Sequence, residues 1–451
     1  MTEKFDIAVI GAGPGGFKAA KRCAQKGASV AIIEKEVIGG TCLNCGCIPS
    51  KALLASAHIL LKAKQAAAMG INIASAVPEW PKIQSRRDEI INSLRKAMTD
   101  SMRALGKIKF IHGSATITSQ NKIMVESNSS PTEIQAEKII IATGSEPIQI
   151  PQIPFDGQTV ISSKEALTLP QIPKSMIIIG GGVIGCEMAC VYAAMGTKIT
   201  VIEAMPNLLP MEDKWVGRLL EREFKKLGID ILTGQKASSL DKASSPAKLV
   251  LENVRTIESE KILVSVGRKP LIDKETIRSL NLKMSGPAIE INEKMETSAP
   301  GVYAIGDVTG KTYLAHGATA QAEAAAANAT GGNNTLTDYS LIPRVIYTFP
   351  EVASVGKTEE TCKAEGIETS VEKAFFRANG RAVAQNETTG EARVIRNNQS
   401  NKIVGITIVG ATATELITLA RMFIGTSEKA VHITFPHPTF SETLEEAIQN
   451  D

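Results

Sequence analysis

The chain has 451 residues, of which 43% are apolar and 22% are charged, and its formal net charge at pH 7 is +3. This length exceeds what one hydrophobic core usually supports and predicts about three domains. The small net charge argues against a nucleic-acid groove or an anionic membrane surface, and the lack of a long apolar run argues against a transmembrane helix.

The first predicted element is an apolar strand from Phe5 to Ile10. Because a strand begins this early, we expect no targeting segment and a protein that works in the cytoplasm. A G-x-G-x-x-G motif follows the strand and opens a helix-compatible stretch, which is the context that a dinucleotide-binding loop requires. Its glycines allow a tight turn and a close approach of the backbone to a pyrophosphate. Glu34 ends the next strand and is placed to accept ribose hydroxyls.

The same arrangement recurs from residue 177, where IIIGGGVIG is followed by a helix-compatible stretch and the strand KITVIEA. Glu34 follows Gly16 by 18 residues, and Glu203 follows Gly185 by the same 18 residues. The matched spacing predicts two dinucleotide-binding units. A carboxylate at Glu203 repels a 2′-phosphate, so the second unit is expected to take NAD rather than NADP.

The remaining elements complete an α/β fold class. Apolar runs ending in glycine predict strands that return to each sheet, and they cover 138–145, 261–270 and 301–308. Helices are predicted over 84–106 and 318–329, and beyond about 345 an α+β pattern follows without dinucleotide glycines. We predict two Rossmann-like dinucleotide-binding domains plus a C-terminal α+β domain. The expected segments are 1–150 (first unit), 151–270 (second unit), 271–345 (a central segment of the first unit) and 346–451 (C-terminal domain).

Seven cysteines are an odd number, and three of them, Cys42, Cys45 and Cys47, fall within six residues of GGTCLNCGCIPSK, residues 39–51. This is not a secreted disulfide framework, and in a reducing compartment such a cluster is typical of catalysis or metal binding. A zinc site would need a second ligand pair, which the sequence lacks, so no metal is expected. A helix predicted to begin near Pro49 favours the nucleophilic thiolate form of a cysteine at its start.

The segment GGTCLNCGCIPSK closely resembles the redox loop of the pyridine nucleotide-disulfide oxidoreductases. The resemblance covers the whole chain, because the family's other motifs occur in the same order. They are GAGPGG, ATGS at 142–145, GGGVIGCE at 180–187, AIGDV at 304–308 and HPT with a following glutamate at 437–442. The ending HPTFSE and the acidic Glu203 are similar to members that oxidise dihydrolipoamide with NAD. Glutathione reductases and mercuric reductases are disfavoured, because no basic patch accompanies Glu203 and no cysteine follows Cys362.

The resemblance implies FAD and NAD as cofactors and protein-bound dihydrolipoamide as substrate, carried by an acyltransferase or a glycine-cleavage carrier. It implies a homodimer in which 346–451 is the dimerisation domain and each site takes a histidine from the other subunit. By family motif, Cys42 exchanges with substrate and Cys47 lies beside the flavin. Lys51 lies near the flavin with Glu187 as its ion partner. The implied acid–base residue is His437, oriented by Glu442.

The implied cofactor contacts also follow the family motifs. For FAD they are Gly11, Gly13, Gly15, Gly16, Glu34, Gly40, Thr41, Lys51, Ala115, Thr143, Gly144, Ser145, Asp307, Leu314, Ala315 and His316. For NAD they are Gly180, Gly182, Val183, Ile184, Gly185, Glu203, Ala237 and Gly267. Two positions depart from the family. Cys45 adds a third thiol where a small aliphatic residue is usual, and Phe435 replaces a histidine.

Two other functions stay open from the sequence. One is a related reductase that uses NADH to reduce a low-molecular-weight disulfide, which an assay of dihydrolipoamide against oxidised glutathione would separate. The other is a mainly structural subunit that docks on a multienzyme core, which weak turnover with strong acyltransferase binding would support. No nucleic-acid or membrane partner is expected.

Overall fold

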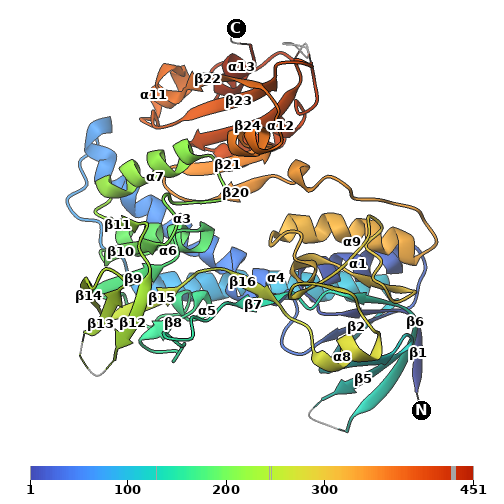
Figure 1. The fold of residues 1–451 in the computed structure, drawn as a ribbon. Coiled ribbons are helices and arrows are strands. Elements are labelled where there is room, and N and C mark those ends of the chain that lie inside the picture. The colour runs from blue at the N-terminus through green and yellow to red at the C-terminus, as the bar shows by residue number, and fades with distance from the viewer. Residues whose placement is uncertain (1, 128–129, 243, 245, 428–432, 450–451) are drawn as a thin grey trace. The chain divides into compact units, whose positions relative to one another are not determined.

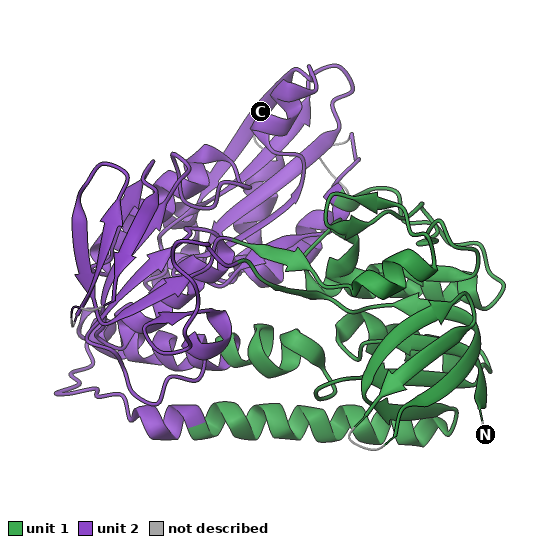
Figure 2. Cartoon of the chain, turned by 60° about the horizontal axis from the view of Figure 1, so that its bottom comes forward, with its two compact units in different colours: residues 1–50, 85–148, 267–339 green, residues 51–84, 149–266, 340–451 purple. Residues whose placement is uncertain are grey.

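The structure is a computed structural model that describes residues 2–127, 130–242, 244, 246–427 and 433–449. The chain divides into two compact units, each built from three separate segments (Figure 2). Unit 1 comprises 1–50, 85–148 and 267–339, and unit 2 comprises 51–84, 149–266 and 340–451. In the part of the chain that is described, no helix is long and apolar enough to cross a membrane.

Unit 1 is built on one sheet in the order β3-β2-β1-β6-β5-β4, with β19 also paired to β6 (Figure 1). β1, β2, β3, β6 and β19 pair in parallel, and the last four residues of β1 are buried because the strand lies between β2 and β6. Alanines of α1 and α9 pack in one core with this sheet. The strands are β1 (Glu3–Ile10), β2 (Val30–Glu34), β3 (Ile108–His112), β4 (Ser114–Ser119), β5 (Lys122–Glu126), β6 (Thr132–Ile141), β7 (Ser145–Pro147), β16 (Arg268–Pro270), β17 (Met284–Ser285), β18 (Ala288–Ile289) and β19 (Val302–Ala304). The helices are α1 (Pro14–Gln25), α2 (Gly40–Cys45), α8 (Lys274–Ser279) and α9 (Ala315–Ala329), with the 3-10 turn η2 (Gly306–Thr309).

Two helices contain residues of both units, α3 (Cys47–Gln65) and α4 (Trp80–Leu105), with the 3-10 turn η1 (Ala66–Met69) between them. The helix predicted over 84–106 is therefore confirmed, although it starts earlier. The alanine-rich helix predicted over 318–329 is also confirmed, as α9.

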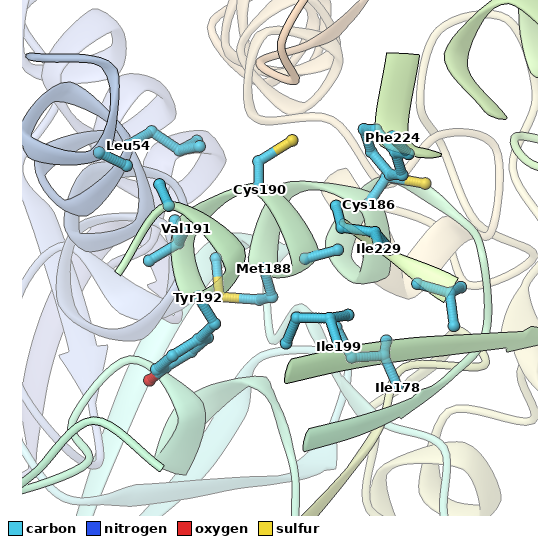
Figure 3. Close-up of a cluster of buried hydrophobic side chains, with 14 of the residues drawn as sticks. Leu54, Ile178, Cys186, Met188, Cys190, Val191, Tyr192, Ile199, Phe224 and Ile229 are labelled. Atoms are coloured by element: carbon cyan, nitrogen blue, oxygen red, sulfur yellow. The ribbon is translucent and has the colours of Figure 1, made fainter. Parts of the chain in front are cut away.

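The second predicted dinucleotide-binding fold lies in unit 2. It contains a five-stranded parallel sheet in the order β11-β10-β9-β15-β8. Beside it, β12, β13 and β14 form an antiparallel sheet. α6 is buried along most of its length, and its Met188 and Tyr192 share a core with Leu54 of α3 and Ile178 of β9 (Figure 3). These elements are β8 (Val160–Ile161), α5 (Ser163–Ala166), β9 (Ser175–Ile179), α6 (Val183–Ala194), β10 (Lys198–Glu203), α7 (Lys214–Lys226), β11 (Asp230–Thr233), β12 (Ala237–Asp241), β13 (Ala247–Leu251), β14 (Thr256–Ser259) and β15 (Lys261–Val264).

The C-terminal part of unit 2 is an antiparallel sheet in the order β20-β21-β24-β23-β22. Buried residues of α12 and α13 pack in one core with it. The elements are η3 (Tyr339–Leu341), which begins in unit 1, then β20 (Arg344–Ile346), β21 (Glu351–Gly356), α10 (Glu359–Ala364), β22 (Thr369–Phe375), η4 (Phe376–Ala378), α11 (Gly380–Ala384), β23 (Glu391–Asn397), β24 (Ile403–Gly410), α12 (Ala413–Arg421) and α13 (Ser441–Gln449).

The predicted fold class is confirmed, since two sheets, one parallel and one mixed with a parallel core, carry glycine-rich loops and precede an α+β region. The predicted boundaries near 150, 270 and 345 stay predictions. The division into two units is coarser, because unit 2 contains both the second dinucleotide-binding fold and the C-terminal sheet.

Candidate active site and nucleotide-binding loops

The first glycine-rich loop joins β1 to α1 in unit 1. Gly11 has a φ of +103°, and a Cβ there would lie 2.4 Å from the carbonyl oxygen of Ala142. A Cβ on Gly16 would lie 1.9 Å from the carbonyl oxygen of Gly11, so neither position admits a side chain. α1 begins after Gly13 without a side-chain cap. Its first N–H groups are therefore available to an anion such as a pyrophosphate.

Glu34 stands at the end of β2, next to this loop, and is buried. Its Oε2 accepts a hydrogen bond from the backbone N–H of Ala12 at 2.8 Å, and its Oε1 accepts one from Glu36 at 2.9 Å. The backbone carbonyl of Glu34 accepts from Gly113, two residues before Ala115, at 2.9 Å. The structure thus brings the predicted residues Glu34 and Ala115 to the region of the glycine loop.

The segment 142–145 approaches the same loop, because Ala142 donates its N–H to Ile10 at 2.8 Å. The Oγ of Ser145 donates to Asp307, and Arg268 donates to the Ser145 Oγ and carbonyl at 2.7 and 2.6 Å. Burial raises the pKa of the Asp307 carboxyl, while the hydrogen bond from Ser145 and the charge of Arg268 oppose that rise. No sequence pattern had singled out Arg268.

Two further features of unit 1 bear on whether a nucleotide fits. The hydroxyl of Thr143 is buried and has no hydrogen-bond partner among the described residues. A Cβ on Gly15 would lie 3.3 Å from Cβ of Ala318, so the start of α9, with its predicted residues Leu314, Ala315 and His316, lies by the start of α1. An uncapped helix start, a glycine cradle and an unsatisfied buried hydroxyl fit a dinucleotide such as FAD.

The second glycine-rich loop, in unit 2, repeats this construction. Gly180 has a φ of +108°, and a Cβ there would lie 2.6 Å from the carbonyl oxygen of Ser265. α6 begins at Val183 after Gly182, again without a side-chain cap. Glu203 ends β10 and accepts from the N–H of Gly181 and of Met205, both at 2.7 Å. These contacts match those of Glu34, as the repeat predicts. Two other residues of the predicted NAD set fall in different units, because Ala237 begins β12 in unit 2 and Gly267 belongs to unit 1.

The cysteine segment forms two consecutive helices, α2 and α3, that meet at Gly46. A Cβ on Gly40 would lie 2.7 Å from Cα of Gly13, and Gly39 donates its N–H to Ala12 at 2.9 Å. α2, which carries Thr41, Cys42 and Cys45, is thereby fixed against the first glycine-rich loop. Cys42, Cys45 and Cys47 are each partly accessible. Cys47 is the first residue of α3, where the positive end of the helix dipole favours a thiolate.

Lys51, four residues after Cys47 on α3, forms an ion pair with Glu187 of α6. Its Nζ lies 2.9 and 2.7 Å from the two carboxylate oxygens of Glu187, whose side chain is 5% exposed. Tyr347, which the sequence did not single out, donates its backbone N–H to Glu187 Oε1 at 3.0 Å. The Lys51 Nζ lies 4.5 Å from the centre of the Tyr347 ring. A half-buried tyrosine in a strand-like run is normally core, so no sequence pattern distinguishes it.

His437 and Glu442 lie at the start of α13. Nδ1 of His437 is 2.8 Å from Glu442 Oε1, and Glu442 Oε2 accepts the N–H of Thr439 at 2.7 Å. The Thr439 N–H and then His437 lower the pKa of the Glu442 carboxyl. The imidazole is 78% exposed. A carboxylate fixed on Nδ1 orients the ring so that Nε2 is available to a substrate. The pair can therefore act as an acid–base group on a molecule that approaches Nε2.

Comparisons with known proteins cover the whole chain. A family model described as "Pyridine nucleotide-disulphide oxidoreductase" matches residues 5–324, and the corresponding dimerisation domain matches 342–448. A dihydrolipoyl dehydrogenase of Bacillus subtilis is 36% identical over 449 residues, covering 98% of this chain and 97% of the relative. One from Chlamydia muridarum is 38% identical over 460 residues, covering 99% and 97%.

Solved structures share the fold. LpdA from Mycobacterium tuberculosis superposes with a TM-score of 0.91 at 24% identity, over 99% of both chains. The HOCl-induced flavoprotein disulfide reductase RclA from Escherichia coli, as a Cu(II) complex, superposes with a TM-score of 0.88 at 25% identity, over 99% of both chains.

Proposed function

Because the chain belongs to the pyridine nucleotide-disulphide oxidoreductase family, we propose that it oxidises protein-bound dihydrolipoamide to lipoamide and reduces NAD. Members of this family use FAD and NAD(H), and the chain is a flavoprotein disulfide oxidoreductase. Its dihydrolipoyl dehydrogenase relatives, matched over nearly their full length, support the choice of substrate. The observation that carries the proposal is the contact of the cysteine-bearing helix α2 with the first glycine-rich loop, at Gly40 and Gly13.

In this proposal FAD is held by the first loop, Glu34, the segment 142–145 and Asp307, and NAD by the second loop and Glu203. Bound there, FAD would supply two-electron redox chemistry that links the reduced cysteines to nicotinamide. The uncapped starts of α1 and α6 hold the two pyrophosphates. Lys51 lies on α3, the helix that begins at Cys47, and pairs with Glu187. It supplies a positive charge near the cysteine segment.

The protein's own groups carry out the thiol chemistry. His437 removes a proton from one substrate thiol, and the resulting thiolate attacks Cys42 of a Cys42–Cys47 disulfide. The S–S bond breaks, Cys47 leaves as a thiolate, and a mixed disulfide forms between the substrate and Cys42. The second substrate thiol then displaces Cys42, giving lipoamide and two reduced cysteines. Glu442 stabilises the imidazolium formed in the first step.

The match to the dimerisation domain over 342–448 supports a homodimer. We propose that each active site combines the Cys42–Cys47 pair of one subunit with His437 of the other. The exposed imidazole supports this arrangement. A lipoyl-bearing acyltransferase or a glycine-cleavage carrier is the proposed source of the dithiol, and a cytoplasmic location stays a prediction.

A second candidate is an NADH-dependent reductase of low-molecular-weight disulfides, favoured by the structural similarity to a flavoprotein disulfide reductase. Steady-state assays separate the two functions. We expect dihydrolipoamide with NAD to give a kcat/KM at least about a hundredfold above that of oxidised glutathione or cystine with NADH. Comparable values, or a preference for the small disulfides, would favour the second function.

A further inference from the structure

Tyr347 contacts both members of the Lys51–Glu187 ion pair. Its backbone N–H donates to Glu187 Oε1 at 3.0 Å, while its ring lies under the Lys51 ammonium, with 4.5 Å between Nζ and the ring centre. All three residues belong to unit 2. One residue from the region after β20 therefore reaches the carboxylate through its backbone and the cation through its side chain.

The two contacts constrain different parts of the pair. Glu187 is almost fully buried, and the Tyr347 N–H holds one of its oxygens in a fixed position. Lys51 is less constrained than Glu187, because its side chain is 32% exposed and a lysine stem is flexible. The ring gives the ammonium a second attractive contact besides the carboxylate, since a cation over an aromatic ring is attracted to its π electrons.

The ring itself is held in place by its surroundings. The Tyr347 hydroxyl lies beside Thr414. Thr414 donates its N–H and hydroxyl to Glu351 at 3.0 and 2.8 Å. Burial, and then the charges of Glu351, Glu187 and Glu415, raise the pKa of the Tyr347 phenol. The ring thus stays uncharged, with its hydroxyl near the start of α12.

We propose that Tyr347 is a positioning residue that fixes the Lys51 ammonium for its action on bound flavin. This inference rests on the proposed function, in which Lys51 lies beside the flavin. A cation near the flavin favours the reduced form, which carries more negative charge, and so raises the midpoint potential. A mobile ammonium raises it less. The C-terminal region of a chain therefore tunes the flavin potential in that same chain.

The test is the two-electron midpoint potential of bound flavin in Tyr347→Leu and Tyr347→Phe, each with Lys51 intact and with Lys51→Met. We expect Tyr347→Leu to lower the reduced-to-oxidised ratio at a fixed reference potential about threefold, the scale of a partly exposed cation–π contact. That ratio corresponds to about 15 mV for a two-electron couple. Tyr347→Phe keeps the ring and should restore the potential. In the Lys51→Met background the leucine substitution should have no effect.

Other outcomes of these potential measurements would overturn either the role of Tyr347 or the proposed placement of Lys51. An equal shift in both Lys51 backgrounds, an equal shift with phenylalanine, or no shift with leucine would overturn the role of Tyr347. If Lys51→Met itself leaves the potential unchanged, the placement of Lys51 in the proposed function fails instead. Should Tyr347→Leu not fold, judged by its thermal transition, Tyr347→Met replaces it with the same expected shift. A crystal structure of the folded variant should show Lys51 displaced, and an unmoved ammonium would contradict the proposal.

Discussion

Carboxylates held at both oxygens recur at the proposed functional positions of this chain. Glu34 and Glu203 each accept two backbone N–H groups, and Glu442 accepts one together with the ring of His437. Glu187 accepts Lys51 and the N–H of Tyr347. A carboxylate fixed in this way does not reorient when a ligand arrives. The entropy cost of ordering its side chain is therefore incurred on folding and not on binding. Each site is thus preorganised.

Glu203 is expected to decide the choice of coenzyme. A 2′-phosphate would meet a fixed negative charge where the ribose hydroxyls of NAD find an acceptor. We predict a kcat/KM for NAD roughly a hundredfold above that for NADP. Glu203→Gln should reduce this preference at least about tenfold, while Glu252→Gln, an exposed glutamate of the same unit, should keep it. Comparable steady-state values for the two coenzymes in the wild type would disprove the assignment.

His437 is expected to serve the acid–base step and no other step of the reaction. His437→Gln should lower the rate of dithiol oxidation about 10²–10⁴-fold, because general-base assistance is lost. Reduction of an artificial acceptor by NADH needs only the flavin and should survive, as should binding of both cofactors. His112→Gln, an exposed histidine on β3, is the matched control. Loss of both activities in His437→Gln would indicate a structural role instead.

At the level of elements, helix starts are the recurring functional feature. α1 and α6 begin uncapped behind glycines, and α3 begins at Cys47. α7 differs, because Asp213 precedes it without capping it and instead accepts the N–H of Glu359 at the start of α10, at 2.7 Å. Burial, and then the hydrogen bond with Glu360, raise the pKa of Asp213, while the pKa of Glu360 is lowered by that same hydrogen bond. The two shifts favour Asp213 over Glu360 as the carrier of the proton that these helix starts share.

This shared proton predicts a pH-dependent stability. Unfolding releases it above the ordinary pKa of an aspartic acid, about 4, so the free energy of unfolding falls as pH rises from there toward the raised pKa. Asp213→Asn keeps a donor toward Glu360 but does not titrate. We expect the variant to gain about 1–3 kcal/mol on the wild type between pH 5 and pH 8 in urea unfolding. Asp230→Asn, an exposed aspartate on β11, should show no such gain. Parallel pH curves for Asp213→Asn and wild type would contradict the shared proton.

The local features of the fold could be predicted from the sequence. Contacts between side chains far apart in the chain could not, because residue types do not specify which partners meet. Both glycine loops and their acidic residues follow from one strand–turn–helix–strand pattern. In each, the glutamate accepts a backbone N–H of the loop 22 residues earlier in the chain. The Lys51–Glu187 pair spans 136 residues, and its prediction needed the family resemblance. The Tyr347 contact with Glu187 spans 160 residues and carries no local periodicity. Asp213 and Glu360 were not anticipated, because a shared proton depends on burial. Phe435, at the departure noted before His437, is a partly buried residue packed against the C-terminal core.

At the scale of the whole molecule, the proposed account requires two chains for each active site. Mixed dimers of His437→Gln with Cys42→Ser/Cys47→Ser test this requirement. A heterodimer contains one site with both lesions and one site with neither, so mixing two inactive parents should restore up to about half of wild-type activity per heterodimer. Each variant refolded alone is the control. Heterodimers that form but stay inactive would place His437 in the site of its own chain.

The central claim is that electrons enter through Cys42 and Cys47, although Cys45 lies between them. The most direct measurement is anaerobic mixing of oxidised, FAD-loaded enzyme with one equivalent of dihydrolipoamide, followed by rapid alkylation and peptide mass analysis. We predict that Cys42 and Cys47 each gain one label and that the labelling of Cys45 is the same before and after mixing. New label on Cys45 in place of Cys47, or no new label on any of the three, would contradict the account.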